Sequence, residues 1–391
     1  MIIPYGRQDI TEEDINEVTK ILRSDFLTQG PQVPKFEKKV SEYCNVSHAT
    51  AVNSATSALH IACMALDLGP GDYLWTSPNT FVASANCARY CGANVDFVDI
   101  DSKTYNMSVE ALSEKLIKAE LSGKLPKIVV PVHFAGQPCD MQAIYNLSKK
   151  YGFKIIEDAS HAIGATYNNI KVGSCAHSDI TVFSFHPVKI ITSAEGGMAL
   201  TNDKIISEKL NRLRTHGITN DKKLMKKRPK EEIWNYQQID LGFNYRMNDI
   251  QAALGLSQMK RLDYYIKSRH EIASNYDKEF ANIEIVTPYQ PKSVYSSYHL
   301  YPIRINQNLK FQVQKKIYSN LREKKILVNL HYAPVHLQPY YEKLGFKKNE
   351  FPEAEIFHRE TITLPMFPIL SRNQQNYVIE SLISAIRTIQ S

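Results

Sequence analysis

Short apolar runs alternate with segments of helical periodicity over the first two thirds of the chain. One helical segment covers residues 56–66, and another follows Asp140, which can serve as its N-cap, and stops at Gly152. The runs that predict strands are residues 49–53, 73–76, 94–98, 127–132, 154–157, 180–184 and 198–201. This alternation favours a largely parallel sheet covered by helices on both faces.

The pattern changes beyond Gly242. Asn248 can cap a long helix, because Gln251 stands three residues later in the position of a capping box. The remaining chain mixes helices with a few strands, such as residues 300–305. We therefore predict an α/β protein with a large domain over residues 1–255, built on a mostly parallel seven-stranded sheet, and a smaller α+β domain over residues 256–391.

The composition agrees with a soluble protein of two domains. Its 391 residues are 43% hydrophobic and 22% charged, which is ordinary for globular proteins. No apolar run approaches the ~20 residues that a membrane span needs, and the first nine residues lack the features of a secretory signal. We expect a cytoplasmic protein that does not interact with membranes.

The formal net charge is +7, and the basic residues are densest in one segment, residues 222–230. Two interpretations of this basic segment stay open: a solvated loop, or a mobile flap near an anionic substrate. Nucleic-acid binding requires a denser basic face with stacking aromatic residues, which the sequence lacks. The basic residues are Lys222, Lys223, Lys226, Lys227, Arg228 and Lys230.

The cysteines do not follow the spacing of a zinc site. Most stand among apolar residues, where small buried thiols are common. We predict reduced thiols and no metal centre. The six cysteines are Cys44, Cys63, Cys87, Cys91, Cys139 and Cys175.

Candidate chemistry gathers at the ends of the predicted strands, where open α/β sheets bind their ligands. Residues 54–57 open a helix with small and hydroxylated side chains, so that its first backbone N–H groups can hold an anion. Phe81 follows the second strand, Asp158 and His161 follow the fifth, and Lys189 follows the sixth. Together they offer a phosphate cradle, an aromatic ring, a carboxylate and an amine.

Each of these residues has an ordinary alternative. Asp158 alone is more often a helix cap or a turn residue, and Lys189 alone is more often a surface lysine. His161 and Phe81 alone are more often structural. Their joint occurrence at successive strand ends instead favours a site for a charged heteroaromatic phosphate.

Several segments resemble the DegT/StrS family of pyridoxal phosphate (PLP)-dependent sugar-nucleotide aminotransferases. The resemblance runs from about Ile2 to the carboxyl terminus and implies an aspartate-aminotransferase-like fold, PLP fold type I. The segments that carry it are NSATSALH at residues 53–60, EDASHA at 157–162, SFHPVK at 184–189 and GFNYRM at 242–247.

Other segments are most similar to the pseudaminic-acid branch of this family. Members of that branch use L-glutamate to aminate C4 of a UDP-linked 4-keto-6-deoxy-N-acetylhexosamine, giving a UDP-4-amino-4,6-dideoxy-N-acetyl-beta-L-altrosamine type product. The segments are residues 5–8, 25–31, 133–140 and 186–192.

The resemblance implies roles for the residues at the strand ends. Lys189 is expected to carry PLP as a Schiff base and to act as the base that moves a proton between substrate and cofactor. Asp158 is expected to pair with the pyridine nitrogen. Ser184 and the Ala55–Thr56 backbone are expected to hold the phosphate, and Phe81 to cover the ring.

Further roles are implied beyond the strand ends. His161 stands where much of the wider family has Gln, and is expected to contact the phenolic oxygen or the ring face of the cofactor. Asn244 resembles a phosphate contact supplied by the neighbouring subunit, which implies a homodimer with shared active sites. Thr28, Gly30 and His331 are candidates for binding the nucleotide sugar.

Other functions remain to be weighed against this one. Family members that deoxygenate a sugar carbon, the PLP-dependent sugar dehydratases, replace the lysine with histidine, so Lys189 favours transamination. A nicotinamide dehydrogenase is disfavoured because no G-x-G-x-x-G follows an early strand. A transaminase for another nucleotide-linked 3- or 4-ketosugar and a non-catalytic regulator of the same fold stay open.

Overall fold

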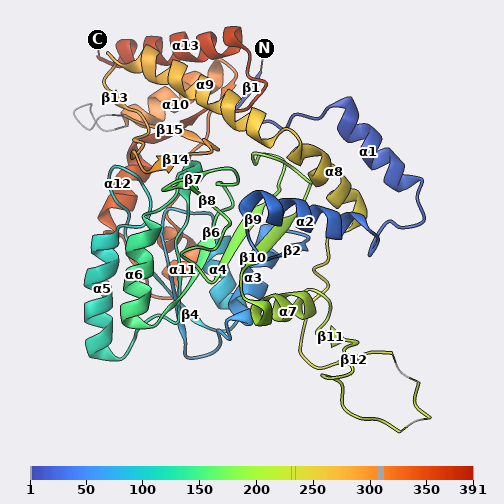
Figure 1. Cartoon of the computed structure of the whole chain (residues 1–391). Coiled ribbons are helices and arrows are strands. Elements are labelled where there is room, and N and C mark those ends of the chain that lie inside the picture. The colour runs from blue at the N-terminus through green and yellow to red at the C-terminus, as the bar shows by residue number, and fades with distance from the viewer. Residues whose placement is uncertain (1, 230, 234, 306–311, 391) are drawn as a thin grey trace.

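A seven-stranded sheet forms the centre of the computed structural model, which describes residues 2–229, 231–233, 235–305 and 312–390 (Figure 1). Only β10 runs against its neighbours β9 and β2, whereas the other pairs are parallel. The predicted mostly parallel seven-stranded sheet is therefore confirmed. In spatial order the strands are β2 (His48–Val52), β10 (Gly197–Thr201), β9 (Ile180–Ser184), β6 (Lys154–Asp158), β5 (Ile128–Val130), β3 (Tyr73–Thr76) and β4 (Asn94–Phe97).

Helices cover both faces of this sheet. Successive strand residues belong to different cores: Val182 of β9 packs with α3, α4 and α7, whereas Phe183 packs with α2 and α8. Ile155 of β6 faces a third core shared with α5 and α6. The helices are α2 (Gln32–Cys44), α3 (Ala55–Ala65), α4 (Ala83–Tyr90), α5 (Val109–Ser122), α6 (Met141–Tyr151), α7 (Lys204–Leu213) and α8 (Asp249–Met259).

The predicted caps explain where several helices begin and end. The Asp140 side chain accepts the backbone N–H of Ala143 at the start of α6, and Gly152 ends the helix in a left-handed conformation with φ 79°. Asn248 and Gln251 form the predicted capping box of α8. These local signals set the helix boundaries near the sheet.

A smaller layer packs beside the sheet. Its core joins residues of α9, α10 and α13 with the three-stranded sheet β13-β15-β17 and with Ile3 of β1, which pairs with β16. The predicted boundary after residue 255 falls inside α8, and α9 begins at Leu262. The elements are β1 (Ile3–Pro4), α9 (Leu262–Phe280), β13 (Ile285–Val286), β15 (Tyr301–Ile305), α10 (Val313–Glu323), β16 (Ile326–Leu327), β17 (Thr361–Leu364) and α13 (Arg372–Gln390).

Short elements connect and extend these layers. Strand β14 pairs with β7 and thereby links the carboxyl-terminal third of the chain to the large domain. Among the described helices, none has both the length and the apolar character needed to cross a membrane. The short elements are α1 (Glu12–Leu22), η1 (Phe134–Gly136), β7 (Thr166–Tyr167), β8 (Ile170–Lys171), β11 (Ile218–Thr219), β12 (Gln237–Gln238), β14 (Val294–Tyr295), η2 (Val335–Leu337), α11 (Pro339–Glu342) and α12 (Pro352–Glu360).

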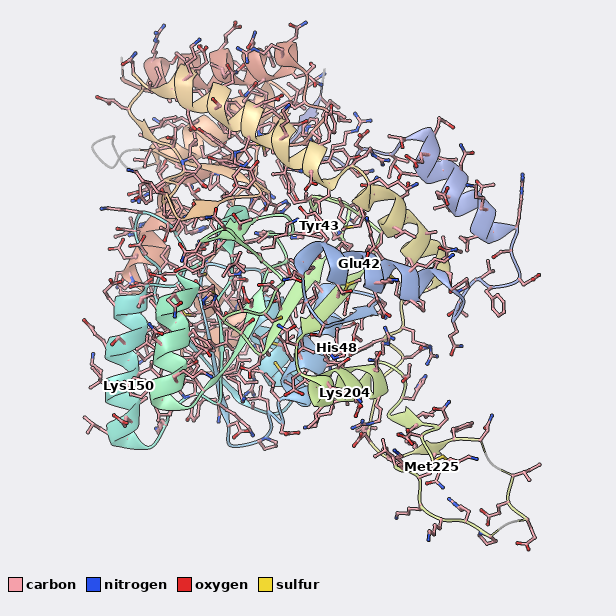
Figure 2. All side chains as sticks on the ribbon, viewed as in Figure 1. Glu42, Tyr43, His48, Lys150, Lys204 and Met225 are labelled. Carbon is pink, nitrogen blue, oxygen red and sulfur yellow. The ribbon has the colours of Figure 1, made fainter. Side chains whose placement is uncertain are left out.

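The basic segment lies on a loop between β11 and β12. Figure 2 shows Met225 on this loop, which extends away from the body of the chain. Lys222, Lys223, Lys226, Lys227 and Arg228 are all exposed, and Lys230 lies outside the described residues. The exposure agrees with either predicted interpretation of the segment.

Candidate active site

A cleft of about 590 Å³ opens at the carboxyl ends of the parallel strands. This volume lies within the range of about 300–1,000 Å³ that is usual for small-molecule sites. Residues from four predicted strand ends and from the small-domain loop meet here, as the sequence predicted. The predicted site residues that line the cleft are Ala55, Thr56, Phe81, Asp158, His161, Ser184, Lys189 and His331.

One wall of the cleft is the turn that opens α3. The Ser54 hydroxyl caps the helix by accepting the backbone N–H of Ser57 at 3.1 Å. A side chain at Gly197 would overlap the carbonyl of Ser54, so only glycine lets β10 approach the turn. The N–H groups of Ala55 and Thr56 belong to the first turn, which has no partners within a helix, and can hold an anion.

Asp158 is fixed at the end of β6 by two hydrogen bonds. Its Oδ2 accepts the Ser84 hydroxyl at 2.6 Å, and its Oδ1 accepts the backbone N–H of Ser160 at 3.1 Å. A carboxylate can only accept hydrogen bonds, so the Ser84 hydroxyl donates its proton to Asp158. The Thr80 hydroxyl therefore donates to the Ser84 oxygen at 2.8 Å. These hydrogen bonds hold the carboxylate in place at the cleft, where a protonated ring nitrogen would suit it as a partner.

Lys189 lies in the turn after β9 and lines the cleft together with Asp158. Burial lowers the pKa of Lys189 to about 8, although the negative charge of Asp158 acts in the opposite direction. An amine with this pKa is about one tenth neutral at pH 7, whereas a free lysine is almost fully charged. Lys189 can therefore act as a nucleophile and as a base near neutral pH.

His161 lines the cleft and has one buried polar atom without a partner. Its Nε2 is hydrogen-bonded to the Tyr332 hydroxyl at 3.2 Å, while its buried Nδ1 has no partner among the described residues. Burial lowers the pKa of His161 well below its ordinary value, and the charges of Lys189 and His331 add to the effect. The ring is therefore neutral, and one of its nitrogens is left without a hydrogen-bond partner.

His331 reaches the cleft from the small domain. Its Nδ1 contacts the Thr363 hydroxyl at 3.0 Å, and its ring lies 5.1 Å from the ring of Tyr5. Burial lowers the pKa of His331 to about 3, with a further contribution from Lys189. At neutral pH this side chain is uncharged and can only recognise a substrate through hydrogen bonds and packing.

Three predicted residues do not line this cleft. Thr28 and Asn244 are exposed, and the backbone N–H of Gly30 donates to Asp249 Oδ2 at 2.8 Å. Asn244 forms an isolated antiparallel bridge with Thr215. The binding roles of these three residues stay predictions. The role of Asn244 also requires a second copy of the chain.

Sequence reasoning missed the residues that hold Asp158 and His161 in place, of which Thr80 and Tyr332 themselves line the cleft. Ser84 and Thr80 hold Asp158, and Tyr332 holds His161. Tyr332 directly follows His331, which was the one available signal for its position. No periodicity could indicate the other contacts, because 74 residues separate Ser84 from Asp158.

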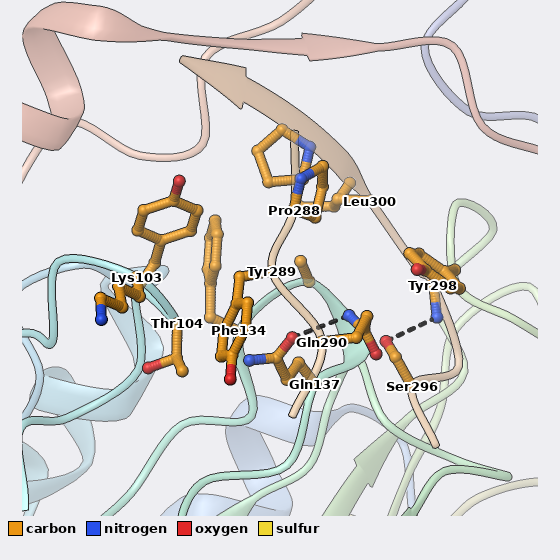
Figure 3. Close-up of a pocket in the computed structure, with 13 residues that line it drawn as sticks. Lys103, Thr104, Phe134, Gln137, Pro288, Tyr289, Gln290, Ser296, Tyr298 and Leu300 are labelled. Carbon is orange, nitrogen blue, oxygen red and sulfur yellow. Dashed lines mark hydrogen bonds between the residues drawn. The ribbon is translucent and has the colours of Figure 1, made fainter. Parts of the chain in front are cut away.

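A second, much smaller pocket is lined by Phe134, whose ring lies 6.4 Å from the ring of His161 in the cleft. Figure 3 shows Gln137 and Gln290 meeting across it, with Gln290 Nε2 donating to Gln137 Oε1 at 2.7 Å. Its volume of about 10 Å³ is that of a single water molecule at most. Within the described residues, no group of His, Cys, Asp and Glu side chains could hold a metal ion. The large cleft is therefore the candidate active site.

The sheet has a single antiparallel strand, and its edge carries a lysine, a carboxylate and an anion-binding helix turn. These features define an aminotransferase of aspartate-aminotransferase-like fold. The profile of the DegT/DnrJ/EryC1/StrS aminotransferase family matches residues 8–383. The chain therefore belongs to this family.

Relatives with known names resemble the chain over its whole length. A UDP-4-amino-4,6-dideoxy-N-acetyl-beta-L-altrosamine transaminase from Campylobacter jejuni is 37% identical over 100% of this chain and 99% of its own. The structure of PseC from Helicobacter pylori, an aminotransferase involved in the biosynthesis of pseudoaminic acid, has a TM-score of 0.90 and 32% identity, covering 99% and 100% of the two chains. The PLP-form structure of Spr1654 from Streptococcus pneumoniae has a TM-score of 0.89 and 30% identity, and covers both chains completely.

Proposed function

We propose that the protein is a PLP-dependent aminotransferase that transfers an amino group from L-glutamate to C4 of a UDP-linked 4-keto-6-deoxy-N-acetylhexosamine. The observation that carries the proposal is Lys189, a lysine with its pKa lowered to about 8, beside Asp158 in the large cleft. The named Campylobacter and Helicobacter relatives support the substrate class. A transaminase of another nucleotide-linked ketosugar is the nearest alternative.

The residues of the cleft fit PLP. The backbone N–H groups of Ala55 and Thr56 and the Ser184 hydroxyl are suited to its phosphate, and Asp158 to its ring nitrogen. The unpaired Nδ1 of His161 offers a partner for a polar atom of the ring, such as the phenolic oxygen. When bound, PLP supplies an electron sink that stabilises negative charge on the reacting carbon.

The chain itself holds the ring and moves the proton. Asp158 keeps the ring nitrogen protonated, because the Ser84 and Ser160 hydrogen bonds stabilise its negative charge. The Lys189 amine takes the proton from the substrate carbon and returns it, which a lowered pKa allows near neutral pH. Phe81, which is 58% exposed at the mouth of the cleft, covers the ring and limits access of water.

The remaining roles complete the proposal. Thr28, Gly30 and His331 bind the nucleotide sugar, and Asn244 reaches the phosphate of the neighbouring subunit in a cytoplasmic homodimer. Asn244 is exposed and does not line the cleft of its own chain, which supports this sharing. The large domain carries the PLP site over residues 1–255, and residues 256–391 form the small domain.

A product assay tests this function. The purified protein receives PLP, L-glutamate and one of three substrates: the UDP-linked 4-keto sugar, its dTDP-linked counterpart or a UDP-linked 3-keto sugar. Mass spectrometry of the products is expected to show amination of the first, and the Lys189→Ala variant is expected to give none.

The possible outcomes test the position of amination, the nucleotide and the reaction class separately. Amination of only the 3-keto sugar would contradict the C4 assignment, and preference for the dTDP sugar would contradict the UDP assignment, without affecting the aminotransferase class. If the PLP-loaded protein aminates none of the three sugars, the proposed function is wrong. A sugar dehydratase would release a deoxygenated product instead.

A further inference from the structure

The loop between α1 and α2 is fastened to the start of α8 by one buried carboxylate. Asp249 is the first residue of α8 and is fully buried. Its Oδ2 accepts the backbone N–H of Gly30 at 2.8 Å, and its Oδ1 accepts the backbone N–H of Gln32 at 2.7 Å. The backbone N–H of Asp249 in turn donates to the carbonyl of Leu27 at 2.9 Å. Three hydrogen bonds therefore join two segments that are far apart in the sequence.

The buried carboxylate is the main support of the loop. A carboxylate is costly to bury unless its oxygens accept hydrogen bonds, and both oxygens of Asp249 do so. The start of α8 adds to this support, because the positive end of a helix dipole favours a negative charge in the first turn. In the described part of the chain, residues 27–30 form no hydrogen bond besides those with Asp249. The position of these four residues therefore depends on one side chain.

The fastened loop presents exposed side chains. Thr28 is exposed, and the neighbouring Phe26 and Leu27 are 55% and 48% exposed. Gly30 fits against the carboxylate only without a side chain, because a Cβ there would lie 3.0 Å from Asp249 Oδ1 and 2.5 Å from the Cβ of Phe26. A loop that is exposed but held at fixed points loses little conformational freedom when it contacts a ligand.

We propose, on the basis of the aminotransferase function proposed above, that Asp249 is a positioning residue for the nucleotide sugar. Its carboxylate sets the position of the loop that carries Thr28 and Gly30, the residues proposed to bind this substrate. Asp249 does not itself touch the sugar, because its side chain is fully buried. It changes the affinity for the sugar through Thr28.

The structural alternative is that Asp249 only caps α2. The N-cap residue of α2 supplies no side-chain hydrogen bond, and Asp249 accepts the N–H of Gln32, the first residue of that helix. Asp99 is a matched case in the same chain, because it accepts the backbone N–H groups of Glu353 and Ala354 at the start of α12, each at 3.0 Å. Asp99 does not line the cleft, so Asp99→Asn shows what the loss of such a cap does by itself.

Steady-state kinetics of the PLP-loaded enzyme separate the two roles. Asp249→Asn keeps the size of the side chain but places an NH2 group opposite a backbone N–H. The KM of the nucleotide sugar is expected to rise about tenfold, because hydrogen bonds to a charged group no longer hold the loop. The kcat value and the conversion of bound PLP by L-glutamate alone, followed by absorbance, are expected to stay unchanged. Asp99→Asn is expected to leave all three values unchanged.

A double-mutant cycle tests whether Asp249 acts through Thr28. Thr28→Ala alone is expected to raise the KM of the sugar. In the Asp249→Asn background the same change is expected to have little further effect, because Thr28 is already displaced, whereas in the Asp99→Asn background it is expected to have its full effect. An unchanged KM in Asp249→Asn or in Thr28→Ala, or independent effects of the two changes, would overturn the assignment.

The wild-type enzyme distinguishes a failure of this assignment from a failure of the proposed function. If L-glutamate does not convert its bound PLP, or if it aminates no nucleotide sugar, the proposed function is wrong. If the wild type is active and Asp249→Asn has a normal KM, only the role of Asp249 is wrong. If Asp249→Asn also loses the conversion by L-glutamate, Asp249→Ser is measured in the same way, because its hydroxyl can rotate to accept a hydrogen bond. Loss of this conversion in both variants would show that Asp249 supports the whole fold rather than the sugar site.

Discussion

At the scale of single residues, the site depends on environments that change ordinary side chains. Burial makes the amine of Lys189 easier to deprotonate, and the hydroxyl chain from Thr80 through Ser84 holds the Asp158 carboxylate in place. The sequence alone placed Lys189 and Asp158 at the correct strand ends. It could not indicate Ser84 or Tyr332, because these contacts join distant segments and follow no local pattern.

The pKa of Lys189 gives the first prediction. In the protein without cofactor, the rate at which an amine-reactive reagent labels Lys189 is expected to rise with pH through about 8, where the neutral amine forms. Asp158→Asn removes the charge that raises this pKa, so the midpoint is expected to shift to lower pH. A midpoint near the free-lysine value of about 10.4 would contradict the account of the site.

Ser84 gives the second prediction. Ser84→Ala removes a 2.6 Å hydrogen bond to a carboxylate, and such bonds contribute about 1.5–3 kcal/mol. PLP binding, followed by absorbance, is expected to weaken by about tenfold or more, because Asp158 loses its support. Ser122→Ala, on the exposed end of α5, is the matched control and should bind PLP normally. Equal affinity in both variants would show that Ser84 does not support Asp158.

At the scale of secondary structure, the period of the apolar runs predicted the strands but not every boundary. Strand β5 ends at Val130 rather than at residue 132, because Pro131 has no N–H to donate to the ladder. The antiparallel direction of β10 could not be predicted, since a buried strand looks the same in either direction. Two-residue strands such as β1 and β16 are too short to show any period.

Gly197 gives the third prediction, which concerns the approach of β10 to the turn that opens α3. Gly197→Ala is expected to destabilise the fold by about 1–3 kcal/mol, since the added methyl overlaps the Ser54 backbone. It should also weaken PLP binding by displacing Ala55. Gly69→Ala is the control, because a Cβ at Gly69 meets no atom within 4 Å. Urea unfolding and PLP titration measure the two effects, and unchanged values for Gly197→Ala would contradict the close approach.

At the scale of the whole molecule, the proposed function requires two copies of the chain. Eight predicted residues share one cleft, namely Ala55, Thr56, Phe81, Asp158, His161, Ser184, Lys189 and His331, whereas Asn244 lies outside it. The motif that contains Asn244 could be recognised in the sequence. The predicted role of Asn244 involves a second subunit, which a single chain does not contain.

Subunit mixing tests this sharing. Lys189→Ala and Asn244→Ala proteins are inactive or weak alone, but a mixed dimer has one site with both residues intact if Asn244 serves its partner. Random exchange of equal amounts is expected to restore about a quarter of the wild-type activity. If Asn244 serves its own chain, the mixed dimer contains no intact site and activity should stay at the average of the two variants.

Reduction with borohydride shows which lysine holds the cofactor. The PLP-loaded enzyme is treated with sodium borohydride, digested and analysed by peptide mass spectrometry. One phosphopyridoxyl group per chain is expected, on Lys189, and it is expected to be absent when L-glutamate is added before the borohydride. A phosphopyridoxyl group on another lysine, or on none, would show that Lys189 does not hold the cofactor.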